Sequence, residues 1–254
     1  MTPSAPSFVT VETLSKNFGS ERVLDRVGFT LERESVFAIL GRSGGGKTTL
    51  LKILAGLVAA DSGRFRLDGR DLTALPPEKR QVVYLYQEPL LFPHLSVREN
   101  LVFGLRLRRL DEAAMRARID PLVERLGLGD HLEKMPAQLS GGQRQRVAFG
   151  RALAIQPPLL LLDEPFGSLD ATTRAEMQKL FREVARQVAI TAIFVTHDVK
   201  EALIVGDRFG HLAGGQLRQF ADAAGFVADP VSGAAAEIAF WNSLAAKTPS
   251  PPRV

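Results

Sequence analysis

The feature that most restricts the fold of this chain is the sequence GRSGGGKT at residues 41–48. It fits the pattern G-x-x-x-x-G-K-[ST], in which backbone amides wrap phosphate groups, a lysine reaches the terminal phosphates and a hydroxyl binds Mg²⁺. The pattern requires a strand before it and a helix after it. An apolar run ends directly before Gly41, and KTTLLKILAGL follows with helical spacing and a terminal Gly56. If this segment were only a glycine-rich turn with a lysine by chance, the strand before it and the helix after it would both be unexplained.

This loop predicts a phosphate site in which Lys47 supplies a point charge and Thr48 a metal ligand. The three consecutive glycines at 44–46 allow the backbone to approach a ligand closely. The residues that we expect to contact the phosphates are Gly41, Arg42, Ser43, Gly44, Gly45, Gly46, Lys47, Thr48 and Thr49.

A second apolar run, LLLLDE, places Asp163 and Glu164 at the carboxyl end of a buried strand. Open parallel sheets present their ligands at this edge. We expect Asp163 to hold Mg²⁺, usually through water, and Glu164 to orient and deprotonate an attacking water. A carboxylate pair that ends a strand is otherwise a helix cap or a solvated turn, and the preceding phosphate loop argues against that alternative.

The order of apolar patterns predicts an α/β chain whose sheet is interrupted and then resumed. FVTVETLSKNF and VGFTLERESVFAIL have the near-alternate spacing of half-buried strands, and PLLLLLDEP and ITAIFVTH are short buried strands around a helical segment. Between them the chain is rich in Arg and Leu with helical periodicity. We predict one domain at 1–230, with core segments 8–88 and 157–230 and a helical subdomain at 89–156, and a short tail at 231–254 whose Pro- and Ser-rich end is disordered.

Composition excludes several classes of protein. The chain has 254 residues, 45% of them hydrophobic, which is ample for a packed core. It has no cysteine, so neither a disulfide nor a thiol-ligated metal contributes. No apolar run approaches the ~20 residues that cross a bilayer. The net charge of +4 comes from arginines spread along the chain near acidic residues, so we predict no nucleic-acid partner.

The sequence LSGGQRQR at residues 139–146 has the pattern of a second anion site at a helix N-terminus. The phosphate loop, LSGGQ and the carboxylate pair, in this order, resemble the ATP-binding-cassette (ABC) ATPases over residues 8–242. In that family LSGGQ contacts the γ-phosphate of ATP bound to the other subunit of a head-to-tail dimer. The resemblance therefore implies a homodimer in which a partner's ATP meets Ser140, Gly141, Gly142 and Gln143.

The resemblance assigns four further roles. Phe18 would stack on adenine, although an isolated Phe is as often core packing. Gln87 would contact magnesium and water and report the nucleotide state to the helical subdomain. Asp170, in a loop that crosses the dimer interface, is by itself an ordinary helix cap. His197 would hydrogen-bond the γ-phosphate, while the other three histidines match no such position.

The resemblance also implies a fold and an activity: a P-loop NTPase (RecA-like) core with an N-terminal antiparallel β-subdomain and an inserted helical subdomain, hydrolysing ATP with Mg²⁺. The catalytic residues would be Glu164, His197, Gln87 and Lys47, and the metal ligands Thr48, Gln87 and Asp163.

LFPHLSVRENLVFGL and THDVKEAL resemble the importer branch that serves maltose, polyamines, sulfate and ferric iron. We therefore expect a cytoplasmic ATPase, peripheral on the inner face of the membrane, that drives separate permease subunits with a solute-binding protein. The permease would dock on residues 87–100. Importers of this branch often carry a C-terminal regulatory domain, and we expect none here.

An ABC exporter subunit stays an alternative. A DNA-repair or ribosomal cassette would show a coiled-coil insertion or tandem cassettes, and a generic P-loop enzyme would lack LSGGQ.

Overall fold

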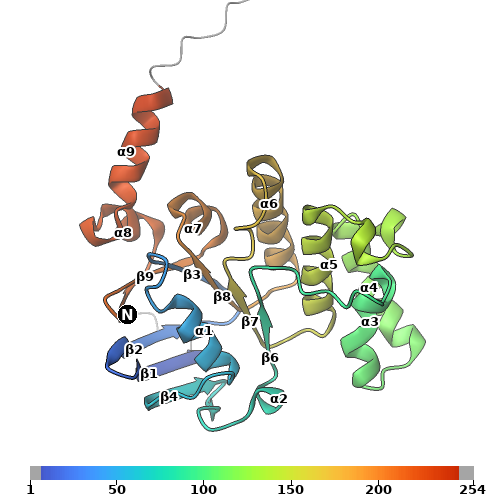
Figure 1. Ribbon diagram of the computed structural model, residues 1–254, viewed down its shortest axis with the longest axis horizontal. Coiled ribbons are helices and arrows are strands. Elements are labelled where there is room, and N and C mark those ends of the chain that lie inside the picture. Colours follow the sequence, from blue (N-terminus) through green and yellow to red (C-terminus); the bar gives the residue numbers. More distant parts are fainter. Residues whose placement is uncertain (1–6, 246–254) are drawn as a thin grey trace, which may run out of the picture.

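The computed structural model describes residues 7–245, which form two sheets flanked by helices (Figure 1). The first sheet is antiparallel, with the strand order β2-β1-β4-β5. Its strands are β1 (Val9–Phe18), β2 (Glu21–Leu31), β4 (Ser62–Leu67) and β5 (Arg70–Asp71). The second sheet has the order β10-β9-β3-β8-β7-β6. Its strands are β3 (Val36–Leu40), β6 (Val82–Leu85), β7 (Leu159–Asp163), β8 (Ala192–Thr196), β9 (Arg208–Ala213) and β10 (Gln216–Phe220).

Two groups of helices stand out in the fold (Figure 1). In Figure 1, α3, α4 and α5 gather beyond the β6 edge of the second sheet, and α9 projects from the body beside α8. The helices are α1 (Lys47–Ala55), α2 (Pro77–Arg80), α3 (Val97–Leu107), α4 (Glu112–Arg125), α5 (Gly141–Ala154), α6 (Ala171–Gln187), α7 (Val199–Val205), α8 (Ala223–Ala228) and α9 (Ala234–Ala245). Short 3₁₀ turns are η1 (Gly129–His131), η2 (Pro136–Gln138) and η3 (Pro230–Ser232). Within residues 7–245 no helix combines the length and the apolar character needed to cross a bilayer.

The second sheet is covered on both faces, because successive side chains of a strand point to opposite sides. Phe37 and Ile39 of β3 belong to an apolar cluster with α1 and the first sheet. Ala38 and Leu40 of the same strand belong to a second cluster with α3–α7. Every residue of β3, β7 and β8 is buried, so the expectation of a half-buried strand over VFAIL was wrong. The chain turns at residues 32–35, and β2 and β3 lie in different sheets.

The predicted α/β fold class is confirmed, including the antiparallel sheet near the N-terminus and the helices inserted between strands. Helices α3, α4 and α5 all lie within residues 89–156, although the domain boundaries themselves stay a prediction. The sequence predicted only a tail after residue 230, whereas the structure forms η3 and α9 there. The predicted disorder at the C-terminus concerns residues that, after 245, lie outside the described range.

Five neighbouring strands of the second sheet run in the same direction, and β9 pairs with β3 at one end of this group. β3 pairs with β8, β8 with β7 and β7 with β6, all in parallel. Their carboxyl ends therefore meet at one edge, which is where open parallel sheets place ligand sites. The glycine loop follows β3, the carboxylate pair ends β7, His197 follows β8, and Gln87 follows β6 by two residues.

One buried charge joins α1 to the antiparallel part of the fold. Arg80 is 5% exposed, and its guanidinium donates to four backbone carbonyls. Two belong to the last turn of α1, Ile53 at 2.6 Å and Leu54 at 3.0 Å, and the others to Leu75 at 2.7 Å and Thr73 at 2.9 Å. Since the last carbonyls of a helix have no partner within it, Arg80 supplies a donor to Leu54 and a second donor to Ile53, whose carbonyl also accepts from the amide of Gly56.

Replacing this arginine tests that role. Arg80→Met keeps much of the side-chain volume and removes all four donors, leaving buried carbonyls unpaired. We expect the free energy of unfolding to fall by about 3 kcal/mol. The exposed neighbour Lys79→Met serves as the control and should change it by no more than about 0.5 kcal/mol. Urea unfolding followed by circular dichroism measures both, and equal losses in the two variants would contradict this role.

Candidate functional site

The glycine loop is shaped by close backbone contacts that exclude side chains. Gly46 precedes α1 with a φ of 92°, and a Cβ atom there would lie 2.8 Å from the carbonyl oxygen of Val23. A Cβ on Gly41 would lie 2.5 Å from the carbonyl oxygen of Leu212. These distances leave no room for any residue other than glycine. The loop thus holds its backbone at the N-terminus of α1, where free amides and the helix dipole favour an anion.

Lys47 is a buried cation at the centre of this loop, with 4% of its surface exposed. Its ammonium donates to the carbonyl oxygens of Gly41 at 2.8 Å and Arg42 at 3.0 Å. Its Nζ also lies 3.2 Å from Oε1 of Glu164. A buried charge is stable only when it is paired and hydrogen-bonded, and these three partners satisfy its three protons. The lysine is therefore held in one position beside the carboxylate.

Asp163, the last residue of β7, has both carboxylate oxygens engaged by hydroxyl donors. Thr48 donates to Oδ1 at 3.0 Å and Tyr84 donates to Oδ2 at 2.6 Å. Burial, followed by the bond to Asp163, raises the pKa of the Tyr84 phenol far above its usual range. The phenol is therefore a proton donor at every physiological pH.

Glu164 is the next residue, and the chain turns sharply at it. Its φ of 46° lies in the left-handed region that non-glycine residues rarely adopt. The turn directs its carboxylate at both Lys47 and His197, whose Nδ1 lies 2.7 Å from Oε2 of Glu164. Backbone strain of this kind occurs at functional sites that the surrounding structure holds in place.

These side chains line one hollow of about 320 Å³. Its walls are Ser43, Gly44, Gly45, Gly46, Lys47, Thr48, Thr49, Gln87, Asp163 and Glu164. A neighbouring hollow of about 890 Å³ contains Gly41, Arg42 and His197. Every residue predicted for the phosphate loop, the metal and the water-activating carboxylate thus lies in or between two adjoining hollows.

The donor set fits Mg²⁺. The hydroxyl of Thr48, the carboxylate of Asp163 and the side-chain amide of Gln87 offer the oxygen ligands that Mg²⁺ prefers, and Mg²⁺ commonly uses few protein ligands together with water and phosphate. Among residues 7–245, no group of three His, Cys, Asp or Glu side chains forms a separate metal cage. The residues present therefore suit a magnesium–nucleotide complex.

Three predicted elements lie away from these hollows. Phe18, at the end of β1, is 51% exposed, and the ammonium of Lys16 lies 5.3 Å from its ring centroid. Ser140 and Asp170 are the N-caps of α5 and α6. The two helix starts are neighbours, because a Cβ on Gly142 would lie 2.5 Å from Cγ2 of Thr173. In one chain, LSGGQ and Asp170 thus form a second cluster that does not line the phosphate hollow.

Comparisons with known proteins agree with this geometry. Residues 24–167 match the family described as ABC transporter. The chain belongs to the ABC transporter family. It is 42% identical over 215 residues to the probable sulfate/thiosulfate import ATP-binding protein CysA of Chlorella vulgaris, covering 85% of this chain and 91% of that protein. The CysA protein of Synechococcus elongatus is 45% identical, with 88% of this chain and 65% of that protein covered.

The CysA protein of Mycobacterium tuberculosis is 44% identical, with 83% of this chain and 60% of that protein covered. The chain thus spans roughly two thirds or less of these two longer ABC relatives. Among solved structures, cbiO1 from Clostridium perfringens, part of the ABC transporter complex cbiONQ, matches with a TM-score of 0.81 at 28% identity, covering 96% of both chains. The matches identify an ABC ATPase and favour the importer branch over the exporter alternative.

The structure adds a residue to the ABC signature segment that the sequence did not single out. His131, in η1, places its Nε2 3.0 Å from the amide nitrogen of Gln143. The amide oxygen of Gln143 accepts from the backbone of Ser140, so its nitrogen faces the histidine as a donor. Nε2 of His131 therefore accepts this hydrogen bond. No spacing in the sequence links the side chains of residues 131 and 143, so the sequence alone does not predict this contact.

A buried carboxylate supports the turn that carries His197. Glu201 of α7 accepts from the hydroxyl of Thr196 and, at 3.1 Å, from the amide of Gln178 in α6. The carbonyl of Thr196 in turn accepts from the amide of Gly41 at 3.2 Å. Burial raises the pKa of the Glu201 carboxyl, with Asp198 adding to the rise, while its two hydrogen bonds and Arg174 oppose it. This network joins α6, the histidine turn and the glycine loop.

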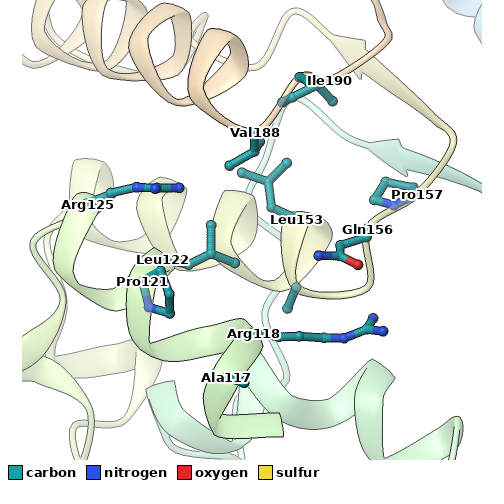
Figure 2. A pocket seen from close by; sticks show the side chains of 12 residues that line it. Ala117, Arg118, Pro121, Leu122, Arg125, Leu153, Gln156, Pro157, Val188 and Ile190 are labelled. Atoms are coloured by element: carbon teal, nitrogen blue, oxygen red, sulfur yellow. The ribbon is translucent and has the colours of Figure 1, made fainter. Parts of the chain in front are cut away.

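A third hollow, of about 450 Å³, lies between α4 and the C-terminal ends of α5 and α6. Figure 2 shows Leu122 of α4 and Leu153 of α5 at its middle, with Val188 above them and Arg118 and Arg125 extending from α4. None of the residues predicted to bind ATP lines it. This hollow is separate from the ABC nucleotide site.

The shifted carboxyl of Glu201 predicts a pH dependence of stability. Because its pKa in the folded protein exceeds that in the unfolded chain, its stabilising contribution is fully present below the unfolded pKa and is lost as the pH rises through the folded pKa. In Glu201→Gln the side chain is uncharged at every pH, so this variant does not lose folding stability in this way. The stability of this variant relative to the wild type should therefore be greater at pH 7.5 than at pH 4.5, by about 1.4 kcal/mol per unit of pKa shift.

Urea unfolding at a series of pH values measures this difference. Glu176→Gln, at an exposed position on α6, is the matched control, and its difference from the wild type should not change with pH in the same direction. A flat profile for Glu201→Gln would show that the carboxyl is not shifted by burial.

Proposed function

We propose that this chain is the ATP-hydrolysing subunit of an importer for sulfate or thiosulfate. The observation that carries the catalytic part is the cluster in which one carboxylate, Glu164, faces both Lys47 and His197 beside the Thr48–Asp163 pair. The substrate class rests on the names of relatives that are 42–45% identical over at least 211 residues.

The proposed reaction is attack of water on the γ-phosphorus of ATP. The bond from that phosphorus to the oxygen bridging the β- and γ-phosphates breaks, giving ADP and inorganic phosphate, while Glu164 accepts the proton of the water. A phosphate oxygen replaces Glu164 as the third partner of Lys47, which leaves the carboxylate free to face the water. His197 holds Glu164 in this orientation through its Nδ1. Thr48, Asp163 and Gln87 would hold Mg²⁺, which would neutralise charge on the phosphates.

We further propose a head-to-tail homodimer, since the start of α5 lies away from the phosphate hollow of its own chain. Ser140 and the amides that follow it would then bind the γ-phosphate on a partner copy. Adenine would stack on the exposed ring of Phe18. Asp170, at the start of the adjacent helix α6, would lie in the same interface.

The segment 87–100 is the proposed docking site for membrane permease subunits. It links Gln87 in the nucleotide hollow to the start of α3. Leu90 is 54% exposed, whereas Leu91 packs against the apolar core and Phe92 packs on Phe103 with a centroid distance of 4.2 Å. Leu90 is therefore the apolar side chain of this segment that is most available to a partner. Such a complex would hold the chain at the inner face of the membrane, with a solute-binding protein on the other side.

The carboxylate base gives the first functional prediction. Glu164→Gln keeps the shape of the side chain and removes its basicity, so ATP hydrolysis should fall by about a hundredfold or more while ATP binding persists. Bound ATP should then trap a dimer, which size-exclusion chromatography detects with and without ATP. Adding Ser140→Arg should abolish the dimer but leave ATP bound to the monomer. Normal turnover of Glu164→Gln would show that another group is the base.

The proposed docking segment, residues 87–100, gives the second functional prediction. Leu90→Asp introduces a charge on an exposed position, so the ATPase activity of the isolated chain should be unchanged while uptake of radiolabelled sulfate by cells carrying the variant falls by about tenfold or more. Leu107→Asp, at the end of α3, is the matched control because Leu107 is also exposed. Sulfate uptake that is equal in the two variants would place the docking surface elsewhere. Uptake that is independent of this chain would refute the substrate assignment.

A further inference from the structure

The carboxylate of Asp163 is held from both sides before any metal is considered. Thr48 approaches Oδ1 from the start of α1, and Tyr84 approaches Oδ2 from the neighbouring strand β6. The bond from Tyr84 is the shorter of the two, at 2.6 Å against 3.0 Å. Short hydrogen bonds from a hydroxyl to an ionised carboxylate are among the strong ones. Tyr84 therefore fixes the rotation of the carboxylate more firmly than Thr48 does.

We propose that Tyr84 is a positioning residue for the magnesium of this site: its phenol anchors Oδ2 of Asp163 and so leaves Oδ1, beside the Thr48 hydroxyl, to face the metal. This inference rests on the proposed function, in which Asp163 and Thr48 hold Mg²⁺. Residues behind a metal ligand that orient it commonly change metal affinity about 10–100-fold when they are replaced.

The position of Tyr84 is set by the sheet. In the parallel ladder of β6 and β7, Tyr84 lies opposite Leu161, two residues before Asp163. Its ring packs edge-on against Tyr86, with the centroids 4.6 Å apart at 75°, and against the apolar cluster that includes α1. The ring is thus fixed by packing and the hydroxyl by Asp163.

Packing alone would not require the hydroxyl. A phenylalanine at position 84 would fill the same space and keep the contact with Tyr86, but it would leave Oδ2 of Asp163, a residue that is 8% exposed, without its donor. A buried charged oxygen without a partner is unfavourable, so the carboxylate would rotate to find another. Tyr84→Phe therefore disturbs the orientation of the metal ligand Asp163 and keeps the packing of the apolar core.

The test measures metal binding separately from hydrolysis. Mn²⁺ serves as the paramagnetic probe, with adenylyl imidodiphosphate as the nucleotide, and electron paramagnetic resonance reports free Mn²⁺ during a titration. We expect Tyr84→Phe to raise the dissociation constant for Mn²⁺ about tenfold. The affinity for the nucleotide in EDTA should stay at the wild-type value, because the glycine loop is untouched.

Tyr86→Phe is the matched control, since it removes the same atom two residues along the chain and should change Mn²⁺ affinity by less than about twofold. In an Asp163→Asn background, Tyr84→Phe should lose most of its effect, because the charge that it orients is gone. An unchanged Mn²⁺ constant in Tyr84→Phe would overturn the proposal, and so would an equal loss of nucleotide binding in EDTA, which indicates a structural role. If the wild type itself bound no nucleotide, the proposed function would fail and this proposal with it.

Discussion

The site depends on the parallel pairing of four strands, because that pairing decides which chain segments meet. Leu40 of β3 lies opposite Thr196 of β8, and Asp163 of β7 lies opposite Val195. A slip of one residue between β7 and β8 would turn Asp163 toward the other face of the sheet, since side chains alternate. Burial on both faces prevents such a slip. The apolar cores of the second sheet thus fix the positions of the polar groups at its edge.

At that edge, each buried charged side chain has its own hydrogen-bonding partners. Lys47 lies between two carbonyls and Glu164, and Asp163 lies between two hydroxyls. Removing one member of such a group leaves an uncompensated buried charge, which is more costly than the pair is favourable. This interdependence explains why the site needs a rigid frame of strands and a glycine loop that tolerates only one backbone path.

The sequence predicted those parts of the site that belong to local patterns. The glycine loop, Asp163 and Glu164 follow strands and could be located by spacing, and His197 by resemblance to the family. Tyr84, His131 and Glu201 could not be found in this way, because each bonds to a side chain that lies elsewhere in the sequence: Asp163, Gln143 and Gln178, respectively. Helix α9 was missed because its Ala-rich sequence has no polar face to indicate a helix period.

The neighbouring starts of α5 and α6 differ in their electrostatics. The carboxylate of Asp170 accepts from the amides of Thr172 and Thr173. Hydrogen bonds from the side chain and the backbone of Thr173, followed by the amide of Thr172, lower its pKa, so α6 begins with a fixed negative charge. Helix α5 begins with Ser140 and has no acidic side chain in its first turn. The positive end of one helix dipole is therefore neutralised internally and the other is left bare. In the proposed dimer, the start of α5 would therefore attract a phosphate group and the start of α6 would repel it. The charge of Asp170 would thus restrict nucleotide binding to one of two neighbouring helix N-termini.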